Sequence, residues 1–258
     1  MTNQSTLLFS TFFALISGGI YAYVGWRLGK RVISSSDGRL AWGAFTLWWY
    51  GLAVTTLIGS FQNLFGAMGL TNLSLFVTAT YVNIFPACIA LWGLLYYLIY
   101  IFTGNKRSLI PLTVFYIIYY ILLVYYTTAS IPDHIEVGRW STMLIYSTPL
   151  RGPFFVILAV LLFFPQIIGS IAYFTLYFRV TDVTQKYRIL LVSGSMMVWL
   201  ISPYIGLVGG VSQNDVWHLA SRFLGLAAPF TILMAYLPPN WLKERYSIIS
   251  LNDENSES

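Results

Sequence analysis

Seven side chains with polar groups stand out within the long apolar runs of this sequence. They are Tyr50, Asn83, Gln166, Trp199, Ser202, Tyr204 and Arg222. Their hydroxyl, amide, indole and guanidinium groups form hydrogen bonds, but none of them is a histidine, a thiol or a carboxylate. Such groups bind ligands or join neighbouring helices more readily than they catalyse proton transfer. We therefore take them as candidate ligand-binding residues, with hydrogen bonding between helices as the alternative.

The apolar runs lack the residue types that most membrane-embedded catalysis requires. No aspartate or glutamate lies in them, which disfavours proton pumping, proton-coupled transport and Mg²⁺-dependent transfer chemistry. Two histidines and the single Cys88 are too few for a zinc cluster or an intrachain disulfide. Ser195 follows a glycine, but no histidine base lies at a suitable depth. We expect a non-enzymatic protein with no metal and no covalent cofactor.

Composition places these residues in a membrane protein. Of the 258 residues, 57% are hydrophobic and only 9% are charged, whereas a soluble domain carries about 25% charged residues. Seven runs are long enough to cross about 30 Å of hydrocarbon at 1.5 Å per residue. They are residues 6–28, 40–66, 73–102, 109–130, 153–178, 189–211 and 217–237. The sequence predicts an all-α integral membrane protein, with one seven-helix domain over residues 1–240 and a short polar tail over 241–258.

The basic residues predict the orientation of this bundle. Eleven of the 14 lysines and arginines lie after the first, third and fifth runs or after the last one. By the positive-inside rule the N-terminus is outside and the tail is cytoplasmic, which fits a protein of the cell membrane. The net charge of +5 comes from these short clusters, so we expect the lipid bilayer as a partner and no nucleic acid.

The one long connection, residues 131–152, lies outside in this orientation. It carries Asp133, His134, Glu136 and Arg139, and it is either a solvated loop or a lid over an outward-facing pocket. The run before it contains several tyrosines near helical spacing, which favours an aromatic packing face. They are Tyr116, Tyr119, Tyr120 and Tyr126.

Two stretches of the sequence align with each other. Residues 12–26 and 163–177 share two phenylalanines, two isoleucines and a glycine in register. The third and seventh runs each hold a mid-run proline, Pro86 and Pro229. This pattern predicts a 3+1+3 internal repeat in which the fourth run is the linker.

The sixth run, "VWLISPYIGLVGG" at residues 198–210, resembles the sixth helix of microbial rhodopsins. That family has the pattern Trp-x-x-Tyr-Pro-x-x-Trp-Leu-Ile-Gly, and its aromatic residues wall the retinal pocket. The resemblance implies a seven-helix fold and places Trp199 and Pro203 at the pocket wall, whereas Ser202 and Gly206 depart from the pattern. The last run has no lysine for a Schiff base, and the third run has no carboxylate counterion. The resemblance therefore implies that a retinoid, carotenoid or lipid would bind non-covalently.

The stretch "FFPQ" at residues 163–166 is similar to PQ-loop and sugar-transporter families. Three functions thus stay open: a small-ligand receptor or sensor, a facilitative transporter, and a structural subunit of a larger membrane complex. Since no kinase or ATPase domain follows the last run, we expect a receptor to signal through a separate cytoplasmic or membrane partner.

Arg222 is the one charged residue of the last run. It lies near the outer boundary, where its side chain can reach the headgroups. Alternatively it points inward to Gln62, Asn63, Asp215, Glu136 or an anionic ligand.

Overall fold

The computed structural model describes residues 3–34, 38–147, 152–212 and 215–246. Most of them form helices: α1 (Asn3–Ser34), α2 (Arg39–Ala67), α3 (Leu73–Thr103), α4 (Leu109–Ala129), α5 (Gly152–Thr175), α6 (Val183–Ser212), α7 (Asp215–Tyr236) and α8 (Asn240–Tyr246). Short 3-10 turns η1 (Lys106–Ser108) and η2 (Leu176–Phe178) follow α3 and α5, and strands β1 (Pro132–Val137) and β2 (Thr142–Tyr146) follow α4.

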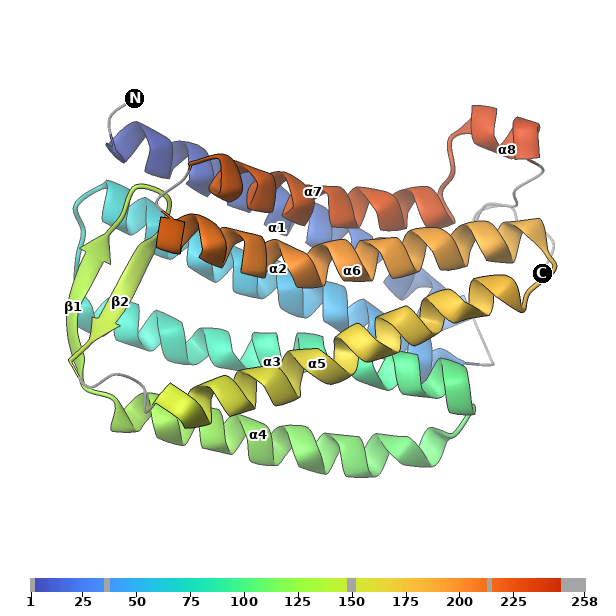
Figure 1. Cartoon of the computed structure of the whole chain (residues 1–258), viewed down its shortest axis with the longest axis horizontal. Helices are drawn as coiled ribbons and strands as arrows, with labels where there is room; N and C mark the ends of the chain where they lie inside the picture. The colour runs from blue at the N-terminus through green and yellow to red at the C-terminus, as the bar shows by residue number, and fades with distance from the viewer. Residues whose placement is uncertain (1–2, 35–37, 148–151, 213–214, 247–258) are drawn as a thin grey trace. The chain divides into compact units, whose positions relative to one another are not determined.

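The chain forms two units, residues 1–32 with 38–163, and residues 33–37 with 164–258. Figure 1 labels the helices α1 to α8 and the strands β1 and β2.

Six helices within the described residues are long and apolar enough to cross a membrane. They cover residues 4–30, 39–67, 73–103, 106–129, 183–206 and 215–236. A shorter apolar helix covers residues 163–178 in the region of the expected fifth span. These helices indicate a multi-pass membrane protein. Five of them agree closely with the expected runs, whereas the sixth run was expected at 189–211 and the helix there begins at residue 183. The expected tail begins with the short helix α8, and its remainder at 247–258 lies outside the described residues.

In the first unit, the backbones of α2 and α3 approach each other closely at Gly51 of α2. A Cβ added to Gly51 of α2 would lie 2.6 Å from the backbone oxygen of Pro86 in α3. Beside this contact, Phe45, Trp48 and Trp49 of α2 are fully buried, and the Phe45 ring stacks on Tyr97 of α3 at 4.4 Å. Glycine lets the two backbones approach, and the aromatic side chains fill the space nearer the N-terminal end of α2.

The connection between α4 and α5, which we expected to be a solvated loop or a lid, contains two short strands. It forms an antiparallel hairpin in which Val137 pairs with Thr142, and Gly138 at the turn donates to the Ser141 oxygen at 3.0 Å. The strands contain β-branched residues, Ile135 and Val137 in β1 and Thr142 and Ile145 in β2, which favour extended backbone. The side chains of Asp133 and His134 are exposed, and His134 Nδ1 lies 3.1 Å from Asp133 Oδ2.

Hydrogen bonds attach the hairpin to α1 and α2. The backbone N–H of Thr142 donates to Asn63 Oδ1 of α2 at 2.7 Å, and Ser10 Oγ of α1 donates to the Trp140 oxygen at 2.8 Å. Burial and the neighbouring Tyr81 of α3 raise the pKa of the Tyr146 phenol, so this side chain is neutral at physiological pH. The hairpin therefore joins the ends of α1, α2 and α3 in the first unit.

In the second unit, α6 and α7 lie side by side along most of their length (Figure 1). Ser195 Oγ of α6 donates to the Ala228 oxygen of α7 at 2.7 Å, and the Tyr187 hydroxyl donates to the Met234 oxygen at 2.9 Å. The Arg188 guanidinium lies 5.7 Å from the Tyr236 ring. Polar side chains thus connect the two helices at several depths.

Candidate functional site

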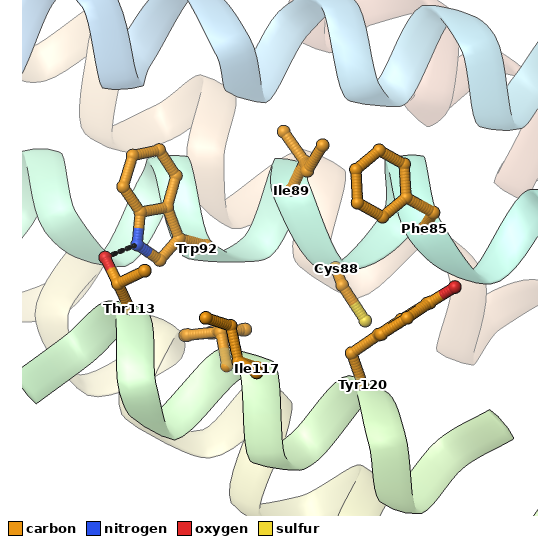
Figure 2. A pocket seen from close by; sticks show the side chains of 8 residues that line it. Phe85, Cys88, Ile89, Trp92, Thr113, Ile117 and Tyr120 are labelled. Atoms are coloured by element: carbon orange, nitrogen blue, oxygen red, sulfur yellow. Dashed lines mark hydrogen bonds between the residues drawn. The ribbon is translucent and has the colours of Figure 1, made fainter. Parts of the chain in front are cut away.

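An apolar groove separates the middle of α3 from α4, and we call it the α3–α4 groove (Figure 2). It encloses a volume of about 160 Å³. Its lining consists of four residues from each helix: Phe85, Cys88, Ile89, Trp92, Thr113, Tyr116, Ile117 and Tyr120. An apolar cavity of about 150 Å³ is large enough to bind benzene. The α3–α4 groove therefore has room for one ring-sized apolar group.

Trp92 and Thr113 join the two helices at one end of the α3–α4 groove. The Trp92 indole N–H donates to Thr113 Oγ1 at 3.2 Å, and Thr113 in turn donates to the Leu109 oxygen at 2.7 Å. The Trp92 ring also stacks on the buried Tyr96 with its plane tilted by only 7°. These contacts fix the orientation of the indole, because its only polar atom has a partner on the facing helix.

Tyr120 and Phe85 form the other end. Their rings meet edge to face with centroids 5.8 Å apart. Figure 2 shows the Cys88 sulfur directed across the groove toward Tyr120, with Ile117 between the two ends. The lining presents mainly aromatic faces and aliphatic groups, so it suits binding of an apolar molecule.

A second hollow lies between α2 and α3 and has a volume of about 350 Å³. Tyr50 lines it, together with Leu47, Gly51, Val54 and Val82. Phe85 and Ile89 line both this hollow and the α3–α4 groove. The two spaces therefore adjoin across one face of α3, and together they form an elongated apolar furrow that includes a predicted site residue, Tyr50.

Asn83, the other predicted site residue of the first unit, lines neither of these spaces. Its Oδ1 atom is buried and has no hydrogen-bond partner. It lies within one turn of Pro86, whose ring removes the N–H that would bond the Val82 oxygen. Tyr50 and Asn83 are thus not brought together in one hollow.

Ser202 in the second unit is engaged with α7. Its hydroxyl donates to the Ser221 oxygen at 2.8 Å, the Ser221 hydroxyl donates to the Ser202 oxygen at 2.8 Å, and the two Oγ atoms are 3.5 Å apart. We call this reciprocal pair the serine clamp. The Ser202 side chain thus forms the interhelical hydrogen bond that we considered as the alternative to ligand binding.

The remaining predicted site residues also lie in the second unit. Gln166 of α5 is fully buried, Trp199 of α6 is half-buried, and Tyr204 of α6 is exposed. Arg222 of α7 is half-buried and directly follows the serine clamp. The predicted set is divided between the two units, so its assembly into a single pocket stays a prediction.

Sequence reasoning did not locate the α3–α4 groove. The tyrosines of the fourth run were expected to form a packing face, and Tyr116 and Tyr119 are indeed buried, but Tyr116 and Tyr120 also line the groove. A usable signal is present in the sequence: Cys88, a small residue, lies at helical spacing between Phe85 and Trp92. Among the described residues, no group of three or more histidine, cysteine or acidic side chains could hold a metal ion.

Comparisons with protein-family models, with curated proteins and with solved structures give no match for this chain. The resemblances to microbial rhodopsins and to PQ-loop transporters therefore stay predictions.

Proposed function

We propose that this protein is a seven-span receptor or sensor of the cell membrane, with its N-terminus outside, that binds an elongated apolar ligand non-covalently. The α3–α4 groove carries the proposal, since it is a ring-sized apolar space at the middle of a membrane helix. A retinoid, a carotenoid or a lipid with a cyclic end group has the required shape. Its ring would lie against Trp92 and Tyr120, and its chain would cross Phe85 and Ile89 toward Tyr50.

The packing of α4 supports a sensing role. Within the described residues, its main contacts are with α3 and the turn η1, and seven of its large apolar side chains are exposed. A ligand between α3 and α4 would therefore displace α4 more readily than α2, which is tightly packed on α3. Only Ser130 and Ile131 separate α4 from β1, so a displacement of α4 would reach the hairpin directly. A separate membrane or cytoplasmic partner would read the change.

The 3+1+3 repeat belongs to the same proposal. In each unit the closest helix pair is the one that the repeat would make equivalent, α2 with α3 and α6 with α7. The later helix of each pair contains the mid-helix proline, Pro86 or Pro229. This correspondence supports α4 as the linker, and a linker with few contacts is suited to move.

Two neighbouring isoleucines of α4 give a matched test. Ile117 and Ile118 are both 54% exposed, but only Ile117 lines the α3–α4 groove. The organic extract of the purified full-length protein is analysed by absorption spectroscopy and mass spectrometry. We expect a bound ring-bearing apolar compound in the wild type and in Ile118→Trp, and at least a tenfold loss in Ile117→Trp because the indole fills the space. Equal amounts in the two variants, or no such compound in the wild type, would overturn the proposal.

Proteoliposomes distinguish a receptor from a facilitative transporter. The compound identified by extraction is labelled and its movement across the bilayer is measured with and without the protein. A receptor gives saturable binding with no protein-dependent flux, whereas protein-dependent flux would contradict the receptor and favour the transporter.

A further inference from the structure

The exposed side of α1 forms a continuous stripe along the helix. Its members are Phe12, Ile16, Gly19, Tyr23, Trp26 and Lys30, all of them exposed. Their spacing alternates between three and four residues, so they lie above one another on one face. The stripe is apolar from Phe12 to Trp26 and becomes cationic at Lys30. The stripe therefore has an apolar part and a charged end, like the acyl chains and the headgroup of a lipid.

Two positive charges converge on Trp26 at the end of this stripe. Lys30 Nζ lies 3.9 Å from the centre of the Trp26 ring, and Arg27 Cζ lies 5.9 Å from it. The Tyr23 ring is 5.7 Å from Trp26 on the apolar side. Tryptophan and tyrosine prefer the depth at which lipid headgroups meet the hydrocarbon, so the two cations are held at the level of the lipid phosphates.

Gly19 leaves a notch in the apolar part of the stripe. A Cβ added there would meet no atom within 4 Å. The helix rises about 16 Å from Gly19 to Lys30 at 1.5 Å per residue, which is about half of the 30 Å hydrocarbon thickness. The distance from the notch to the charges thus matches one lipid leaflet.

We propose that this face of α1 binds an anionic glycerophospholipid, with its phosphate at Arg27 and Lys30 and an acyl chain along Tyr23 and the Gly19 notch. The charges select an anionic headgroup, and the apolar stripe distinguishes a whole lipid from a free anion. Each basic residue near an anionic lipid surface contributes about a fivefold preference. Two of them therefore favour an anionic over a zwitterionic lipid by about 25-fold.

The full-length protein is loaded with equal amounts of phosphatidylglycerol and phosphatidylcholine that carry the same chains, and bound lipids are counted by native mass spectrometry. We expect about a 25-fold preference for phosphatidylglycerol in the wild type and almost none in Arg27→Gln/Lys30→Gln. The control Lys106→Gln/Arg107→Gln removes two exposed charges from η1 in the same unit and should keep the preference. Gly19→Leu should lower total bound lipid but not the ratio, because it fills the notch and leaves the charges in place.

Three results would overturn this proposal. The first is an unchanged preference in Arg27→Gln/Lys30→Gln. The second is an equal loss in the η1 control, which would mean that overall charge sets the preference. The third is displacement of phosphatidylglycerol by excess inorganic phosphate, which would mean that the cations bind an anion without its acyl chains.

Discussion

Removal of the serine clamp should loosen α6 from α7 by a measurable amount. Ser202→Ala and Ser221→Ala each delete one 2.8 Å hydrogen bond to a backbone oxygen of the facing helix. Interhelical hydrogen bonds in membranes average about 0.6 kcal/mol and reach about 1.7 kcal/mol. We therefore expect each substitution to lower the free energy of unfolding by about 0.6 to 1.7 kcal/mol.

The two bonds should also depend on each other. Their Oγ atoms are 3.5 Å apart, and loss of either bond relaxes the same crossing of α6 and α7. In a double-mutant cycle, the two substitutions together should cost less than the sum of the single ones by at least about 0.5 kcal/mol. Reversible unfolding in mixed micelles, followed by tryptophan fluorescence, gives these free energies.

Ser193→Ala is the matched control on the same helix. Its hydroxyl is buried, and it donates to the Ile189 and Leu190 oxygens of α6 itself, at 2.7 and 3.1 Å. Removal of such a bond within one helix is nearly neutral. The reasoning is refuted if Ser193→Ala costs as much as Ser202→Ala, or if the clamp variants unfold like the wild type.

Two further predictions concern the first unit. Gly51→Ala should destabilise the protein by about 1 to 3 kcal/mol relative to Gly59→Ala in the same micelle assay. The added Cβ at position 51 would lie 2.6 Å from the Pro86 oxygen, whereas a Cβ at Gly59 meets nothing within 4 Å. Equal stabilities of the two variants would contradict the close packing of α2 on α3. Asn63→Ala should speed hydrogen exchange at the Thr142 amide by about tenfold, since that N–H loses its 2.7 Å acceptor, and an unchanged rate would show that Asn63 does not hold the hairpin.

The helices were predictable from the sequence because lipid leaves the backbone few alternatives. Backbone N–H and C=O groups inside the hydrocarbon need hydrogen-bond partners, and an α-helix supplies them within its own segment, so long continuous apolar runs favour helices. The second run was expected at 40–66, and α2 covers Arg39–Ala67. The hairpin was not predicted, since its strands are short and its stability depends on Asn63 and Ser10 from distant parts of the chain.

The candidate site was harder to predict than the helices. The sequence indicated which polar residues lie deep in the membrane, but the facing residue depends on how two helices are rotated against each other. Ser202 meets Ser221 and not a ligand cavity, and Trp92 meets Thr113 across the α3–α4 groove. Neither pair has a local sequence signal. The helix that carries each residue was thus predictable, whereas the residue that faces it was not.

Photoaffinity labelling with a phenyl diazirine tests the central claim most directly, because the probe is a ring-sized apolar group. The labelled full-length protein is digested and the modified residues are mapped by mass spectrometry. We predict saturable labelling of the groove-lining segments 85–92 and 113–120, lost in Ile117→Trp and retained in Ile118→Trp. Labelling spread evenly over the exposed faces of all the helices, without saturation and unchanged in Ile117→Trp, would contradict the account.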